Sequence, residues 1–277
     1  MTMVDADADL SSMKRNTNKP GRAFVPFPPG LVPVHIVARR NRFTVEATPA
    51  PGDASPVALH LPNSGRMTEL LEPGTVGLAQ LTGKARHLAP DETTAPAAAR
   101  RADGTPRRTV GTLLLVHYAG RWVSVDARMP NRLFARCLEV DMLPPFRGYA
   151  SWRGEVRWGQ GRVDFLLEAP DRPPCLVETK SCNLVENGLA LFPDAPTSRG
   201  TRHLTELAEA VETGRRAAVV WFVQRDDARA LAPHRAADPA FAQALARARA
   251  AGVEAYAYRC RVEPAGIRVL DEIPVEQ

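Results

Sequence analysis

The sequence has no hydrophobic run long enough to cross a bilayer and no secretory signal at its start. Cysteine is scarce too: the 277 residues include four cysteines, and none form a CxxC pair. This scarcity excludes a disulfide-stapled secreted scaffold and the common zinc patterns, and it predicts free thiols in a reducing compartment. We therefore expect a cytoplasmic protein with no membrane partner.

A strong charge of one sign is also missing, since the net charge is +5 and 24% of residues are charged. The charge is uneven, however. Residues 1–150 carry 19 Lys and Arg against 13 Asp and Glu, whereas residues 151–277 carry 17 against 18. A basic N-terminal half favours an anionic partner such as nucleic acid. A solvated surface with flexible basic segments explains the same excess equally well.

Short runs with strand character begin at Leu31 and follow one another without a helix. They span residues 31–40, 41–48, 56–62, 75–81, 109–118 and 122–126. Strands at this spacing predict a small barrel. Residues 1–23 are polar and aperiodic, which predicts disorder. Residues 83–109 are rich in Ala, Pro, Thr and Arg, which predicts a flexible insertion between two strands.

The second half alternates strands and helices. Residues 130–141 begin with proline and predict a helix that joins two domains. A buried strand is expected at 217–223, and two helices are expected, one capped by Thr197 or Ser198 and one opened by Asp238. The order predicts an α/β fold with a barrel domain at 24–145 and a second domain at 146–277.

Two strand-like runs, Gly161–Leu167 and Cys175–Ser181, flank a turn with two prolines and predict a hairpin. Residues two apart on a strand share a face, so Glu178 and Lys180 point the same way. A suitable register brings Asp164 beside them. The sequence then predicts two carboxylates and a lysine at one end of a sheet.

Two carboxylates supply the hard oxygen ligands that Mg²⁺ or Mn²⁺ prefers, so Asp164 and Glu178 are candidate metal ligands. Lys180 is placed to orient an attacking water. An Asp followed at a distance by Glu-x-Lys is the signature of the PD-(D/E)XK nucleases, and Glu155 is a candidate for their additional acidic residue. The alternative is an ordinary surface hairpin.

The barrel half holds candidate phosphate and base contacts near one predicted turn. Guanidinium groups bind phosphates, and aromatic rings stack on bases. The candidate nucleic-acid contacts of this kind are Arg39, Arg40, Arg42 and Phe43. These residues also suit a solvated turn. The turn 62–66 adds Asn63 and Arg66, whose glycine-containing backbone and guanidinium suit an anion. The alternative there is a structural Asx-turn.

Four motifs occur in order and at characteristic spacing: LPNSGRM (61–67), EVRWGQGRVDF (155–165), VETKS (177–181) and FPDAPTSRGTRHLTEL (192–207). Together they resemble the sugar fermentation stimulation protein A family of bacteria and archaea. The resemblance implies an N-terminal OB-like nucleic-acid-binding domain and a PD-(D/E)XK-like domain with a mixed sheet. It also implies non-specific DNA binding and an effect on sugar metabolism.

The resemblance places Arg199 and His203 in a motif near the active site. Arg199 could hold a phosphate, and His203 could bond a phosphate oxygen or the metal's water. A surface histidine is the alternative reading of His203. Periodicity puts both residues on a polar face of the expected helix, away from its apolar stripe.

These observations predict a sequence-nonspecific DNA-binding protein with a Mg²⁺-dependent phosphodiesterase site, whose catalytic residues are Asp164, Glu178, Lys180, Glu155 and His203. The alternative is a non-catalytic DNA-binding regulator of sugar metabolism that keeps the nuclease fold. RNA in place of DNA, and a homodimer, stay open.

Overall fold

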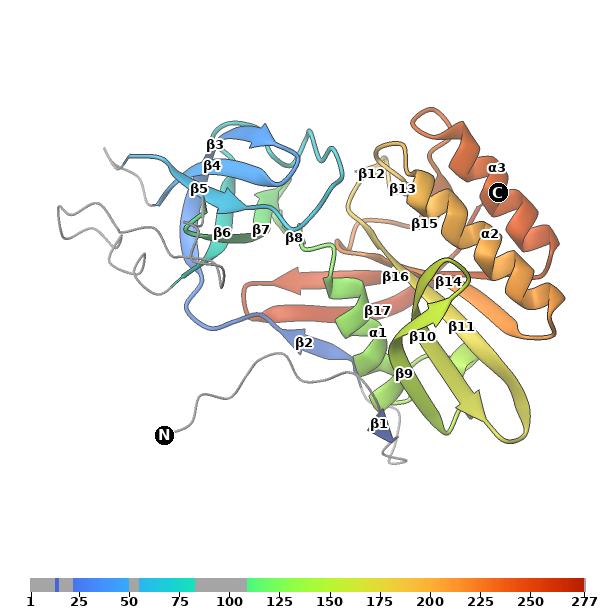
Figure 1. Cartoon of the computed structure of the whole chain (residues 1–277). Helices are drawn as coiled ribbons and strands as arrows, with labels where there is room; N and C mark the ends of the chain where they lie inside the picture. The colour runs from blue at the N-terminus through green and yellow to red at the C-terminus, as the bar shows by residue number, and fades with distance from the viewer. Residues whose placement is uncertain (1–12, 15–21, 50–54, 83–108, 277) are drawn as a thin grey trace.

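The computed structural model describes residues 13–14, 22–49, 55–82 and 109–276. It places a small barrel beside a larger mixed sheet (Figure 1). The predicted disordered extension 1–23 and flexible insertion 83–109 lie almost wholly outside the described residues. Within the described ranges, no helix is long and apolar enough to cross a membrane.

The predicted barrel is present. Its strands are β3 (Val32–Asn41), β4 (Thr44–Pro49), β5 (Val57–His60), β6 (Val76–Leu81), β7 (Gly111–Tyr118) and β8 (Arg121–Ser124). Parallel pairing of β5 with β7 closes strands β3 to β7, and β8 continues beside β7. A Cβ atom at Gly111 would lie 2.5 Å from the carbonyl oxygen of Gln80, so glycine is required where β7 meets β6.

The mixed sheet of the second half has the order β1-β9-β10-β11-β14-β16-β17-β2. Its strands are β1 (Met13–Lys14), β9 (Ser151–Trp158), β10 (Gly161–Ala169), β11 (Arg172–Cys182), β14 (Arg216–Val223), β16 (Glu254–Glu263), β17 (Gly266–Ile273) and β2 (Phe24–Pro26). Strand β14 runs parallel to β11 and β16, and the other pairs are antiparallel. A small sheet lies beside it, with β12 (Val185–Glu186), β13 (Leu189–Phe192) and β15 (Ala230–Pro233).

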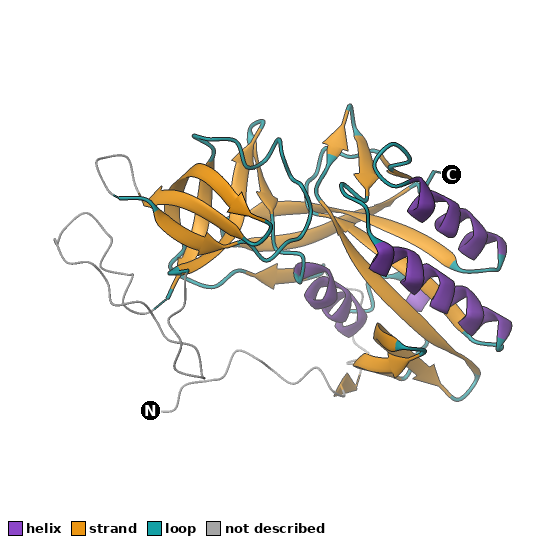
Figure 2. Ribbon diagram, turned by 45° about the horizontal axis from the view of Figure 1, so that its top comes forward, coloured by secondary structure: helices purple, strands orange, loops and turns teal. Residues whose placement is uncertain are grey.

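Helices cover both faces of the mixed sheet (Figure 2). Helices α2 (Ser198–Glu212) and α3 (Pro239–Ala250) lie on one face, and α1 (Met129–Glu139) lies on the other, followed by a 3-10 turn at Pro144–Phe146. Strand β14 is buried from Ala217 to Val223, and these residues enter the two cores alternately. This double burial explains its unbroken apolar run.

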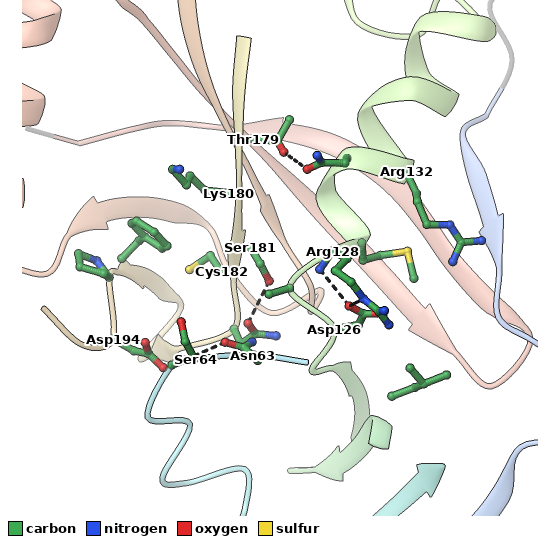
Figure 3. A pocket seen from close by; sticks show the side chains of 18 of the residues that line it. Asn63, Ser64, Asp126, Arg128, Arg132, Thr179, Lys180, Ser181, Cys182 and Asp194 are labelled. Atoms are coloured by element: carbon green, nitrogen blue, oxygen red, sulfur yellow. Dashed lines mark hydrogen bonds and ion pairs between the residues drawn. The ribbon is translucent and has the colours of Figure 1, made fainter. Parts of the chain in front are cut away.

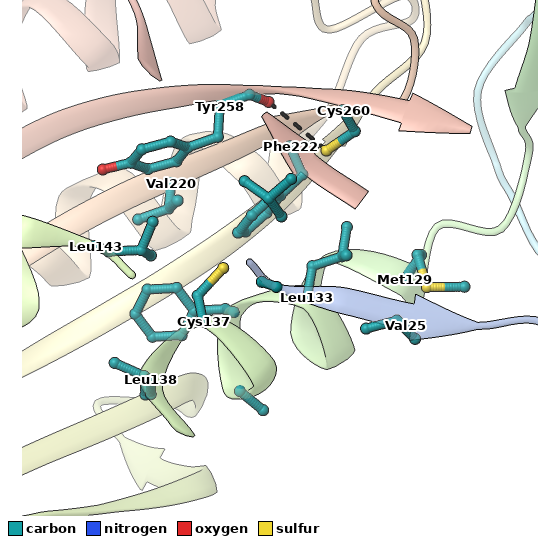
Figure 4. Packing of buried hydrophobic residues seen from close by; sticks show 14 of the residues in the cluster. Val25, Met129, Leu133, Cys137, Leu138, Leu143, Val220, Phe222, Tyr258 and Cys260 are labelled. Carbon is teal, nitrogen blue, oxygen red and sulfur yellow. Dashed lines mark hydrogen bonds between the residues drawn. The ribbon is translucent and has the colours of Figure 1, made fainter. Parts of the chain in front are cut away.

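The N-terminal segment differs from the predicted domain limits. The predicted barrel domain begins at residue 24, but Phe24–Pro26 pairs with β17 at the far edge of the mixed sheet. Val25 packs in the same core as Leu133 of α1 and Phe222 of β14 (Figure 4). Helix α1 therefore belongs to the mixed-sheet unit as well. Local sequence did not reveal this pairing, because β2 and β17 are more than 200 residues apart along the chain.

Polar contacts tie the barrel to the mixed sheet. The side chain of Asn183 donates to the carbonyl of Ser124, and Gln224 Nε2 donates to the carbonyl of Asp126 over 3.1 Å. Arg225 is 2% exposed and lies 5.3 Å from the ring centre of Tyr118 in β7. Since these groups are buried and paired, the barrel is held in one orientation beside the sheet.

Candidate active site

The predicted hairpin is strands β10 and β11, and its register sets the positions of the acidic side chains. Phe165 pairs with Val177, so Asp164 and Glu178 lie one position further along neighbouring strands. Both residues line a cleft between the sheet and the barrel. The two positions are therefore neighbours, but the Asp164 side chain bonds Thr179 and Asn131 rather than joining Glu178 and Lys180 on their face, which corrects the predicted trio.

Glu178 is buried, with 4% of its surface exposed, and two side chains hold it. Lys180 Nζ donates to Glu178 Oε1 over 2.6 Å, and His203 Nδ1 bonds the same oxygen. Burial by itself raises the pKa of this carboxyl group, but Lys180 and His203 outweigh it and lower the pKa to about 2. Glu178 is therefore ionised at neutral pH.

Asp164 belongs to a second network, on the α1 side of the sheet. Its Oδ2 accepts from the backbone N–H of Thr179 over 2.8 Å, and its Oδ1 accepts from Asn131 Nδ2 over 3.2 Å. Burial and then the negative charge of Glu178 raise the pKa of Asp164. The two carboxylates thus act on each other electrostatically although different partners hold them.

His203 does not lie on a polar face of α2, which corrects the expectation from periodicity. The imidazole is 5% exposed and faces the end of β11, where Glu178 gives it a buried polar partner. Arg199 Nε donates to His203 Nε2 over 3.3 Å. Since Nε2 accepts, Nδ1 carries the hydrogen directed at Glu178. His203 therefore supports Glu178 from behind and does not reach the cleft.

The cleft has a volume of about 1260 Å³ and two chemically different walls. The mixed-sheet wall contains Asp164, Glu178, Thr179 and Lys180, and the barrel wall contains the turn with Asn63 and Ser64. Figure 3 shows this turn across from β11, with the N-terminal end of α1 to one side. Four arginines also line the cleft, namely Arg42, Arg128, Arg132 and Arg199.

Glu155 completes a row of carboxylates across three strands. The β9–β10 register pairs Val156 with Val163 and Gly154 with Phe165, so Glu155 lies opposite Asp164. Glu155 is exposed, lines the cleft and has a φ angle of 52°, in the left-handed region that a glutamate rarely adopts. Such strain is common at functional sites and directs this side chain away from a regular pleat.

Two family models match the chain. The model described as the SfsA N-terminal OB domain matches residues 37–125, and the model described as the sugar fermentation stimulation protein RE domain matches residues 128–266. The chain belongs to the sugar fermentation stimulation protein family. The predicted family and fold are thereby confirmed.

Relatives in this family match nearly the whole chain. The chain is 43% identical over 252 residues to the sugar fermentation stimulation protein homolog of Moorella thermoacetica, covering 91% of this chain and 99% of the relative. It is 44% identical to the homolog of Symbiobacterium thermophilum, covering 87% and 92%. The solved structure of Pyrococcus furiosus SfsA in complex with Ca²⁺ has 26% identity and a TM-score of 0.74, and the match covers 94% of this chain and all of that one.

Seven of the candidate residues chosen from the sequence line the cleft of this family member. They are Asp164, Glu178, Lys180, Glu155, Arg42, Asn63 and Arg199. Five others do not line it, namely His203, Arg39, Arg40, Phe43 and Arg66.

Two of these five have structural partners in the barrel. Arg39 donates to the carbonyls of Gly65 and Arg42 over 2.7 Å and 3.0 Å, so its guanidinium links two turns. Arg40 forms an ion pair with Glu46 over 2.6 Å. Phe43 is 49% exposed beside the cleft residue Arg42, so it remains a candidate for stacking outside the cleft.

The turn at 62–66 is the Asx-turn that the sequence left open. Asn63 Oδ1 accepts from the backbone N–H of Gly65 over 2.9 Å. Asp194 of the fourth motif lies against the same turn, and its Oδ2 accepts from the backbone N–H of Met67 over 3.1 Å. Two family motifs more than 100 residues apart therefore meet at the barrel wall of the cleft.

Sequence reasoning missed Asn131 and Thr179, whose side chains bond to each other and to Asp164. It also missed Arg128 and Arg132 at the start of α1. The available signal was the cluster of polar residues in the first turn of the predicted helix. This signal is weak, because only the docking of α1 beside β10 brings that turn to the cleft.

The donor set suits a hard cation better than zinc or another thiophilic metal. Among the described residues, no group of three or more His, Cys, Asp or Glu side chains is arranged to hold a metal. Two carboxylates with water ligands are sufficient for Mg²⁺. Lys180 and His203 both bond Oε1 of Glu178, and no hydrogen bond or ion pair involves its Oε2 among the described residues. The residues therefore fit Mg²⁺ or Mn²⁺.

Proposed function

We propose that the protein binds nucleic acid in this cleft without sequence specificity and hydrolyses its phosphodiester bonds with the help of Mg²⁺ or Mn²⁺. The observation that carries this proposal is the placement of Asp164, Glu178 and Lys180 in the wall of a cleft that also exposes arginines. Carboxylates alone would repel a polyanion. The arginines supply positive charge for a phosphate backbone, which would lie beside the divalent-metal site formed by the carboxylates.

The roles of the side chains follow from their contacts. Asp164 and Glu178 would hold the divalent cation, which supplies charge neutralisation at the phosphate and acidifies a water. Lys180 donates to Glu178 and lines the cleft, so its ammonium group can also position the attacking water. Arg199 can hold a phosphate oxygen while its Nε keeps His203 in the tautomer that supports Glu178.

The family supports a divalent cation. The relative from Pyrococcus furiosus is described as a complex with Ca²⁺. Calcium takes the same oxygen ligands as Mg²⁺ but accepts a looser geometry, so it commonly occupies sites of this kind. The OB-like barrel supports nucleic acid as the partner, because such barrels bind single strands through basic grooves.

A cleavage assay tests this proposal. Purified protein is incubated with end-labelled single- and double-stranded DNA and RNA in Mg²⁺, in Mn²⁺ or in EDTA. We expect metal-dependent cleavage that is lost in Glu178→Gln, Asp164→Asn and Lys180→Ala. Glu168→Gln, which changes a carboxylate on the same strand as Asp164 but outside the cleft, is the matched control.

Calorimetric titration separates metal binding from the water-positioning step. Metal binding should be lost in Glu178→Gln and kept in Lys180→Ala, because only the first removes a ligand. Wild-type protein that binds nucleic acid but neither binds metal nor cleaves would establish the alternative, a non-catalytic DNA-binding regulator.

A further inference from the structure

The β9–β10 hairpin carries an unusual pair of charges next to the cleft. Arg157 and Arg162 are direct cross-strand partners, and both are exposed. Like charges directly opposite each other on a hairpin are destabilising. An anion between them would convert this repulsion into attraction.

Neither arginine has a protein partner among the described residues: no hydrogen bond, ion pair or ring contact involves either guanidinium. Other arginines of the same sheet do have carboxylate partners. Arg153 pairs with Glu168 over 3.1 Å, and Arg172 pairs with Asp171 over 3.2 Å. Among the described arginines of the mixed sheet, the lack of a partner is therefore particular to this cross-strand pair.

The pair faces the same side of the sheet as Asp164, the side of α1, whereas Glu178 contacts His203 of α2 on the other side. Val156 and Val163 pack into the core beneath α2, so the residues on either side of them point to the opposite face. Those residues are Arg157 on β9, and Arg162 and Asp164 on β10, whereas the left-handed φ of Glu155 breaks the regular alternation at that position. Arg162 thus lies two residues, or about 7 Å, along β10 from Asp164, and Arg157 lies beside it on β9.

We infer that Arg157 and Arg162 form a phosphate-binding pair for a nucleic-acid backbone that leaves the cleft along the β9–β10 hairpin. The site takes a phosphodiester group adjacent to the one held at Asp164 and Glu178. Two guanidinium groups supply planar, fixed donors for phosphate oxygens and read no base. This inference rests on the proposed function, and it adds a binding surface outside the basic N-terminal half.

The test is nucleic-acid binding by the full-length double variant Arg157→Gln/Arg162→Gln. The matched control is Arg153→Gln/Arg172→Gln, which removes the same charge from the same sheet at arginines that already have carboxylate partners. Fluorescence anisotropy with labelled single-stranded and duplex DNA is measured in EDTA over a range of salt concentrations, so that cleavage does not contribute.

We expect the test variant to raise the Kd about tenfold at low salt. The slope of log K against log salt should fall by roughly 1.4 for single strands and 1.8 for duplex, as two lost phosphate contacts require. The control variant should change little. Without DNA, the test variant should melt at a higher temperature than wild type at low salt, because the repulsion is gone.

Two results would overturn the inference in distinguishable ways. Equal binding by the test variant and wild type, while wild type still cleaves with metal, would remove the pair and leave the proposed function intact. Absence of DNA and RNA binding by wild type would remove both. If inorganic phosphate at constant ionic strength stabilised wild type but not the test variant, with DNA affinity unchanged, the pair would be a small-anion site instead.

Discussion

At the scale of single residues, the support of Glu178 depends on a histidine that never touches the cleft. His203 bonds Glu178 from α2, and Arg199 bonds the other side of the imidazole. Because Glu178 is buried and ionised, each donor to it matters more than a surface contact would. The bond from His203 therefore matters as much for holding the Glu178 carboxylate as the bond from Lys180 does.

Replacing His203 with alanine should therefore lower the free energy of unfolding by about 2 kcal/mol, because a buried charge loses a donor. It should also weaken metal binding, since Glu178 is no longer held in place. Urea unfolding and calorimetric titration measure the two effects. Thr205→Ala, an exposed change on the same helix, is the control. A His203→Ala protein as stable as the control would contradict this account.

Glu254 offers a pH test far from the cleft. Arg216 donates to both of its oxygens, over 2.5 Å and 2.6 Å. Burial alone raises the pKa of Glu254, but the bonds from Arg216 and Tyr256 outweigh it and lower the pKa. A lowered pKa stabilises the fold above the ordinary glutamate pKa, and this stability is lost as the pH falls through the folded-state value.

Glu254→Gln should accordingly lower the free energy of unfolding by about 1–2 kcal/mol at pH 7, after allowance for partial exposure. The difference from wild type should shrink below about pH 4.3, where unfolded glutamate becomes protonated. Denaturant titrations at several pH values measure it. A difference that stays constant down to pH 3 would show that the ion pair is not its source.

At the scale of elements, the turn at residues 62–66 packs against the segment that precedes α2. A Cβ atom at Gly65 would lie 2.5 Å from Asp194 Oδ2. Asp194 also accepts from the backbone of Met67. Glycine is therefore required because another element approaches the backbone, and the barrel wall of the cleft depends on this contact.

Gly65→Ala should lower the free energy of unfolding by about 1–3 kcal/mol through overpacking. In an Asp194→Ala background, the same change should cost much less, since the clashing carboxylate is gone. The two effects should not add, and a double-mutant cycle by urea unfolding measures the coupling. Strict additivity would mean that the two residues do not meet as the structure places them.

At the scale of the whole molecule, the chain passes from the mixed sheet to the barrel and back again. Strand β2 leaves the mixed sheet and leads into the barrel, and α1 leads back from the barrel to the sheet. Asn183 bonds Ser124 and Gln224 bonds Asp126 between the two units, and Arg225 packs against the ring of Tyr118. Contacts between the two units therefore hold the two walls of the cleft side by side.

Deletion of residues 1–30 should destabilise the mixed-sheet unit although it removes nothing within the two matched family ranges. The deletion strips Ala23, Val25 and Phe27 from the core, which predicts a loss of about 3–5 kcal/mol. Deletion of residues 1–12 is the control, because it keeps β1 and β2. Thermal unfolding measures both. Equal melting temperatures would show that β2 is dispensable.

The sequence by itself determined the elements and their chemistry. Alternating apolar residues predicted the barrel strands, the unbroken run at 217–223 predicted a buried strand, and Thr197 and Asp238 marked the starts of two helices. Each of these signals comes from residues that are close together in the sequence, so it can be recognised without knowledge of the fold. The shared face of Glu178 and Lys180 was readable for the same reason, because strand alternation orders them, whereas the bonds of Asp164 to Thr179 and Asn131 were not.

Only the tertiary structure decided what surrounds these residues. Periodicity placed His203 outside the apolar stripe but did not show that the end of β11 would cover it. No sequence pattern near β2 predicted its pairing with β17, and none near Gly65 predicted the contact of its turn with Asp194. Each contact joins segments far apart in the chain, and its energy exists only once the sheet has formed and excluded water.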